Sequence, residues 1–235
     1  MERIRSLACR FWSEEFNRID QFSIVERWSS AFHKAEKFVL LRALQQRIKA
    51  IKDSYGLVDL WVIARLNLSV LCLLGSAAPG LHWWEFFLVL VGAYSIFEAF
   101  VVQVNVLVFE GYRAGKEGRR HEVKSYRRLV ATSLHNYAEI TVWFALFYRN
   151  LEWAFSSGRL PINSFWVSLN FSFYTMTTFG HTEVSPSSSL GIAVTLIQST
   201  IGLLMVLLIL SGFISLLPPP FTKDKAERDE HCALH

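Results

Sequence analysis

Residues 160–189 read LPINSFWVSLNFSFYTMTTFGHTEVSPSSS, a stretch that begins like a membrane helix and stops before it could cross a membrane. Asn163 or Ser164 can cap a helix start, and about 13 residues follow, fewer than the ~20 that a spanning helix needs. Beyond them, Pro186 forbids helix. We therefore predict a re-entrant loop, in which a short helix dips into the membrane and an extended strand leaves it. Such backbone survives at membrane depth only when it is buried in protein or lines an aqueous path.

The apolar residues around this stretch form four blocks: 57–76, 85–109, 129–148 and 190–217. Each block is long enough to cross ~30 Å of hydrocarbon at about 1.5 Å per residue. None has the polar face that a soluble helix needs. We predict an all-α membrane protein with four transmembrane helices and the re-entrant segment between the third and the fourth.

The composition and the placement of charge fit this topology. The 235 residues are 52% hydrophobic and only 19% charged, with 19 Phe and 8 Trp. Basic residues crowd the predicted loop 110–128, whereas the loop between the first two blocks has none. Because Lys and Arg in short loops mark the cytoplasmic side, we expect both termini inside and 150–188 outside. The expected location is the plasma or inner membrane.

The N-terminal segment 1–56 and the tail 218–235 are expected in the cytoplasm. Leucine and isoleucine recur at helical spacing over 40–51, opposite basic and amide side chains, which predicts a basic amphipathic helix. Such a helix lies either on the anionic inner leaflet or against another cytoplasmic segment.

The re-entrant stretch resembles the pore loop of the potassium channel family, which reads TTxGYGD with a proline shortly after. The matching positions are Thr177, Thr178, Gly180 and Pro186, with Phe179 at the variable position and Glu183 in place of the aspartate. The resemblance implies that 129–217 is a pore module of outer helix, pore helix, filter and inner helix. The segment 57–109 then contributes two added transmembrane helices.

The resemblance further implies a homotetramer in membrane lipid that conducts monovalent cations, with K⁺ as the permeant ion and no cofactor. The implied ion-binding filter consists of Thr178, Phe179, Gly180, His181 and Thr182, with Glu183 at the outer mouth. Gly202 falls where the family has a gating hinge in the inner helix. Its rival explanation is close packing, since small residues let membrane helices approach each other.

Two residues depart from the family pattern, because His181-Thr182 replaces Tyr-Gly. Thr is β-branched and resists the positive φ that the second glycine allows. Because selectivity depends on the carbonyl ligands, we expect relaxed K⁺ selectivity. His181 either titrates at the outer mouth near neutral pH or packs behind the filter strand.

Three charges lie deep inside the predicted spans, where charge is costly and marks pairing or function. Arg65, Glu98 and Glu139 lie at similar depths from the inner ends of their spans. We predict a buried pair of Arg65 and Glu98, with Glu139 as a competing partner. The pair either couples the added helices to the pore or fixes helix packing.

Other function classes fit the sequence less well. The motifs HExxH, GxSxG and GxxxxGK[ST] are missing, so we expect no enzyme, and we expect no metal site. A net charge of +4 is too small to indicate nucleic acid. Two alternatives to a channel stay open: a non-conducting membrane scaffold or sensor that retains the pore fold, and a transporter subunit whose loop binds an ion.

Overall fold

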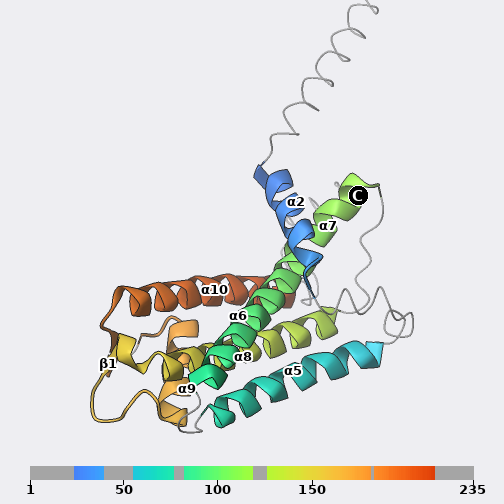
Figure 1. The fold of residues 1–235 in the computed structure, drawn as a ribbon. Coiled ribbons are helices and arrows are strands. Elements are labelled where there is room, and N and C mark those ends of the chain that lie inside the picture. The colour runs from blue at the N-terminus through green and yellow to red at the C-terminus, as the bar shows by residue number, and fades with distance from the viewer. Residues whose placement is uncertain (1–23, 40–54, 77–81, 119–125, 181–182, 215–235) are drawn as a thin grey trace, which may run out of the picture.

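The computed structural model describes residues 24–39, 55–76, 82–118, 126–180 and 183–214 of the chain. These residues are mostly helical (Figure 1). The longer helices are α2 (Ile24–Glu36), α5 (Tyr55–Gly75), α6 (His82–Val104), α8 (Tyr126–Asn150), α9 (Phe165–Met176) and α10 (Ser189–Ile214). The short elements are the π-helical turn η1 (Asn105–Phe109), α7 (Glu110–Lys116), the 3₁₀ turn η2 (Glu152–Ala154), and the strands β1 (Phe155–Ser157) and β2 (Val184–Pro186).

Helix α8 is the centre of the bundle and packs against α5, α6, α9 and α10 (Figure 1). Its side chains Ile140, Trp143 and Leu146 are almost fully buried. The predicted third span is therefore the core of the fold. This explains why it tolerates more polar residues than the other spans, since its polar side chains face protein.

Within the described residues, two helices are long and apolar enough to cross a membrane, Trp83–Lys116 and Ser189–Ile214. The first of these joins α6, η1 and α7 into 34 continuous residues, which at 1.5 Å per residue make a rod of about 51 Å. The predicted boundary at residue 109 falls inside this rod. Arg113 and Lys116, assigned above to a loop, lie instead on the last helical turns. The four-span topology stays a prediction.

The strands β1 and β2 pair in antiparallel fashion and join the two ends of the segment predicted to be re-entrant. Ser156 lies opposite Ser185, and the ladder is extended by backbone hydrogen bonds on both sides, from Gly158 N to Glu183 O and from Ser187 N to Ala154 O. The chain thus leaves and returns at the same end of the bundle, as a re-entrant loop requires.

The N-terminal helix α2 packs against the far end of the α6 rod (Figure 1). The Phe32 ring lies 5.4 Å from that of Phe109, and Asn105 Nδ2 donates to Phe32 O at 3.0 Å. Lys116 forms an ion pair with Glu26. The amphipathic helix predicted over 40–51 and the tail 218–235 lie outside the described residues.

Candidate functional site

Helix α9 is the short helix predicted from the opening stretch. It spans 12 residues from Phe165, directly after Ser164 in extended backbone at the N-cap. One face is buried against α8 and α10 and carries Ser168, Phe171, Ser172, Thr175 and Met176. The opposite face exposes Trp166 and Phe173. At about 1.5 Å per residue the helix is about 18 Å long, too short to cross a bilayer.

The end of α9 is a Schellman motif that carries a threonine where glycine is usual. Phe179 N donates to Tyr174 O at 3.1 Å, and Thr178 N donates to Thr175 O at 3.2 Å. Thr178 has φ +60°, the only positive φ of a non-glycine residue among the described residues. A β-branched residue in left-handed backbone costs about 1–2 kcal/mol, and strain of this kind is concentrated at functional sites.

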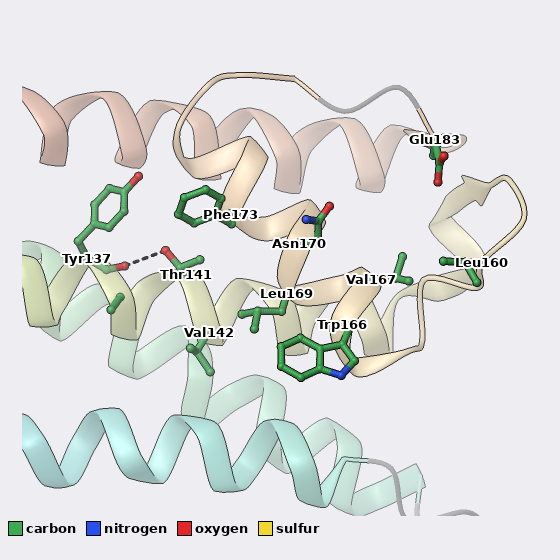
Figure 2. Close-up of a pocket in the computed structure, with 11 residues that line it drawn as sticks. Tyr137, Thr141, Val142, Leu160, Trp166, Val167, Leu169, Asn170, Phe173 and Glu183 are labelled. Atoms are coloured by element: carbon green, nitrogen blue, oxygen red, sulfur yellow. Dashed lines mark hydrogen bonds between the residues drawn. The ribbon is translucent and has the colours of Figure 1, made fainter.

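The residues predicted to bind ions follow this helix end. Gly180 also adopts left-handed backbone, with φ +76°. Thr178, Phe179 and Gly180 are exposed in the single chain, Phe179 to 78%. His181 and Thr182 lie outside the described residues. Glu183 is exposed directly before β2, on the side of the molecule where α9 begins (Figure 2).

An open, mainly apolar groove of about 640 Å³ lies between α8 and α9 (Figure 2). Its floor is formed by Tyr137 and Thr141 of α8 and by Leu169 and Phe173 of α9. Trp166, which is 74% exposed, lines one end. Helix α9, which forms one wall of the groove, and the exposed segment 178–180 are consecutive in the chain.

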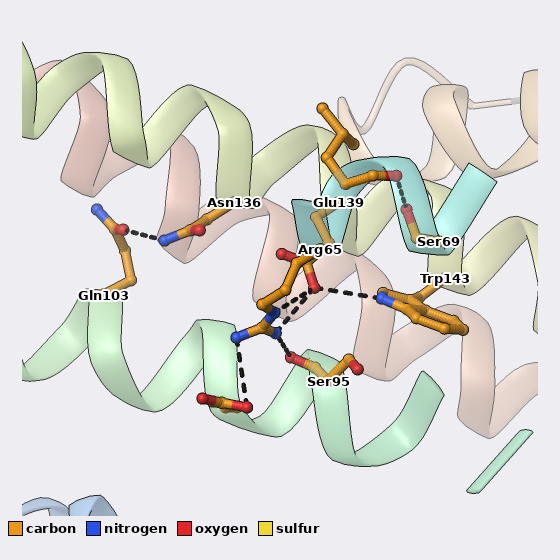
Figure 3. A network of polar contacts seen from close by, with 9 residues as sticks. Arg65, Ser69, Ser95, Gln103, Asn136, Glu139 and Trp143 are labelled. Carbon is orange, nitrogen blue, oxygen red and sulfur yellow. Dashed lines mark hydrogen bonds and ion pairs between the residues drawn. The ribbon is translucent and has the colours of Figure 1, made fainter. Parts of the chain in front are cut away.

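The three charges predicted to pair lie together between α5, α6 and α8 (Figure 3). Arg65 Nη1 lies 3.3 Å from Glu98 Oε2, and its Nη2 lies 2.8 Å from Glu139 Oε1. Arg65 Nη2 also donates to Ser95 O, and Trp143 Nε1 donates to Glu139 Oε1. Arg65 therefore binds both carboxylates at once, and Glu139, named above as the competitor, is the nearer.

Three neutral polar residues continue this cluster along α6 and α8. Asn136 Nδ2 donates to Gln103 Oε1 at 3.0 Å, and Gln103 Nε2 donates to Ser133 Oγ. All three residues are buried. They were not predicted from the sequence, although amide side chains within apolar spans are a usable signal because they need buried partners.

Gly202 lies against the C-terminal end of α9. A Cβ at this position would collide with the carbonyl group of Met176. Helix α10 runs without a break through Gly202, from Ser189 to Ile214. This geometry agrees with the explanation that Gly202 lets α10 pack closely against α9. The role of Gly202 as a gating hinge stays a prediction.

A second buried polar cluster was also not predicted from the sequence. It joins Tyr148, Ser172 and Gln198 from α8, α9 and α10. The available signal was Gln198, an amide in a span that has no ionisable side chain. Within the described ranges, no three His, Cys, Asp or Glu side chains come together as a metal site would require.

Comparison with known proteins adds no relative to this picture. No protein-family model matches the sequence, and neither the curated proteins nor the solved structures contain a match. Function therefore has to be inferred from the residues of 160–189 and the elements packed around them.

Proposed function

We propose that the chain is the subunit of a homotetrameric cation channel that conducts K⁺ through a filter formed by residues 178–182. The observation that carries this proposal is the end of α9. A helix too short to cross a membrane stops in the middle of the molecule, and left-handed backbone follows it, strained at Thr178 and unstrained at Gly180. The pairing of β1 with β2 then returns the chain to its starting side.

The electrostatics of α9 favour a cation at this point. The C-terminal end of a helix carries about half a negative elementary charge. No residue of Phe165–Met176 is ionisable except Tyr174, so no charged side chain of α9 offsets the negative end of its dipole. Rings of backbone carbonyl groups are the usual ligands in K⁺ filters.

The exposed apolar surface of the single chain supports an assembly. One chain supplies one strand of carbonyl groups, and a closed ring needs several. Phe179, Trp166 and the groove between α8 and α9 expose apolar surface around the proposed filter, and such surface is typical of contact with another protein or with lipid. In the proposed tetramer, a neighbouring subunit covers these surfaces.

The proposed filter is atypical, and we propose that its K⁺ selectivity is relaxed. Thr182 occupies the position at which the family has its second glycine, and threonine resists positive φ. The sites formed by Thr178, Phe179 and Gly180 keep their residue types. The same substitution is the feature that favours the alternative, a non-conducting membrane scaffold or sensor.

Cation flux across the membrane of proteoliposomes tests the proposal. Purified protein reconstituted with K⁺ inside should let K⁺ pass, and the reversal potential in mixed K⁺ and Na⁺ should report the selectivity. The assembly should have four times the 27.0 kDa mass of the chain, apart from bound detergent. A monomer, or a folded tetramer without flux, would favour the scaffold.

A pair of glycine variants separates the filter from general strain. Gly180 and Gly118 both have positive φ, +76° and +64°, and a Cβ added at either position would meet no atom within 4 Å. Gly180→Ala and Gly118→Ala therefore introduce the same kind of backbone strain at two places. We expect Gly180→Ala to abolish K⁺ flux and Gly118→Ala to retain it.

A further inference from the structure

Three buried polar side chains join the helices behind the proposed filter. Tyr148 of α8, Ser172 of α9 and Gln198 of α10 are each fully inaccessible to solvent. Gln198 Nε2 donates to Ser172 O at 2.9 Å and to Ser172 Oγ at 2.8 Å. Tyr148 OH donates to Gln198 Oε1, and Ser172 Oγ donates to Thr141 O at 2.6 Å. Outer helix, pore helix and inner helix thus meet at one amide.

The orientation of the Gln198 amide follows from its partners. A backbone carbonyl can only accept a hydrogen bond, so the NH₂ group of Gln198 must face Ser172 O. The amide oxygen then points to Tyr148, whose hydroxyl donates. Both hydrogens and the oxygen of the amide are used, and a buried polar network whose members are all satisfied makes its surroundings rigid.

The same face of α10 contacts α9 on two successive turns. Gln198 contacts Ser172, and Gly202 contacts Met176. Gly202 and Met176 each lie four residues further along their helix than Gln198 and Ser172. The first contact is directional because it consists of hydrogen bonds. The second is a close backbone approach that requires a residue without a Cβ at position 202 and has no hydrogen bond to a side chain. Thr178, the first residue of the proposed filter, lies two residues beyond Met176.

We propose that Gln198 is a positioning residue for ion selection: it fixes the height of α9, and with it the height of the filter backbone, relative to the inner helix. This inference rests on the proposed channel function. Selectivity depends on the geometry of carbonyl ligands, so a pore helix free to shift along α10 discriminates less between K⁺ and Na⁺. Gln198 acts through Ser172 and does not touch the ion.

The test compares two buried glutamines. Gln103 is also buried, and its hydrogen bonds go to Ser133 and Asn136 on α8, so Gln103→Leu removes an equivalent amide away from α9. Both variants should have lower thermal midpoints than the wild type. In reconstituted tetramers, Gln198→Leu should reduce the K⁺/Na⁺ permeability ratio about fivefold, the factor that corresponds to the net free energy of one hydrogen bond. Gln103→Leu should leave the ratio unchanged.

Two milder variants keep the test decisive if Gln198→Leu fails to fold. Tyr148→Phe removes one hydroxyl and retains the ring that packs on Phe155 and Phe171. Ser172→Ala removes the hydroxyl between Gln198 and Thr141. Each should shift the permeability ratio in the same direction as Gln198→Leu, and should speed hydrogen exchange of the backbone amides at the C-terminal end of α9.

The outcomes separate this inference from the proposed function. The positioning role alone would be overturned if the wild type conducts K⁺ and the folded Gln198, Tyr148 and Ser172 variants have the same permeability ratio as the wild type. An equal change of ratio in Gln103→Leu would overturn it too, since the effect would then be one of stability. Absence of flux from the wild-type tetramer would overturn the channel and the selectivity role together.

Discussion

Arg65 binds Glu139 with two nitrogens on one carboxylate oxygen, Nε at 3.0 Å and Nη2 at 2.8 Å. The same guanidinium holds Glu98, and the side chains of Glu139 and Glu98 are only 1% and 3% exposed. The cluster joins the two helices that precede the proposed pore module to its outer helix. Buried ion pairs add little net stability, but removal of one partner is costly because it leaves an uncompensated charge.

Arg65→Leu is therefore expected to lower the free energy of unfolding by about 3–5 kcal/mol, or to prevent assembly. The matched control is Arg128→Leu. Arg128 pairs with Asp59 at 2.8 Å between α8 and α5, but these side chains are 32% and 47% exposed, so its loss should cost at most about 1 kcal/mol. Thermal midpoints in one detergent measure both. Equal losses would show that burial of the cluster is not what stabilises it.

Gly202→Ala should destabilise the protein by about 1–3 kcal/mol through overpacking, because the new methyl group collides with the backbone carbonyl of Met176. Gly115→Ala is the control, since Gly115 lies in helix α7 with open space around it and alanine favours helix. Thermal midpoints of the two variants should move in opposite directions. A neutral Gly202→Ala would indicate that α10 and α9 separate more easily than their contact suggests.

Thr178→Gly should raise the free energy of unfolding by about 0.5–1 kcal/mol. The change relieves the strain of left-handed threonine, and this gain is partly offset because glycine makes the unfolded chain more flexible. Thr177→Gly is the matched control. Thr177 has φ −85°, and its hydroxyl donates to Phe173 O at 2.8 Å, so this change relieves nothing and loses a hydrogen bond. Denaturation of the detergent-solubilised protein compares them. Destabilisation by both variants would argue against strain at Thr178.

A disulfide should form between cysteines placed at Ser156 and Ser185, which are directly opposite in the β1–β2 ladder and both exposed. The distance between such opposite Cα atoms is about 5.5 Å, within the range of a disulfide. Ser156→Cys with Ser187→Cys is the off-register control, at a diagonal distance of roughly 7–8 Å. Oxidation in a background without the three native cysteines, followed by mass analysis, gives the answer. Efficient bonding of the control would contradict the register.

The predictions from sequence were most accurate for segments that one property defines, such as apolar composition or length. The fourth predicted span has no ionisable side chain, and α10 is one of the two described helices apolar enough to cross a membrane. The short helix was predictable because Pro186 and the loss of helical pattern limit its length. Arg65 and Glu98 could be matched in depth because the rise per residue is constant.

Other features depend on how each helix is rotated about its axis and how the helices pack together. The spacing of apolar residues in the sequence does not give this information. Depth alone could not show that Glu139 is the nearer partner of Arg65, because the rotation of each helix decides which side chains face each other. The basic residues Arg113 and Lys116 were assigned to a loop, but they lie on helix α7, where their partners are Asn105 and Glu26. The conformation of Thr178 is set by the helix end, where glycine would have been the expected residue.

The ladder between β1 and β2 also bears on how subunits come together. It closes the chain over about 30 residues, and closing such a loop costs roughly 3 kcal/mol of chain entropy beyond a constant. The backbone pairing of β1 with β2 offsets this cost within one polypeptide, so closure of the loop does not require a neighbouring subunit. In the proposed tetramer, each newly synthesised chain therefore brings a preformed pore helix to assembly, and oligomerisation is the docking of rigid surfaces rather than the folding of four loops around a common axis.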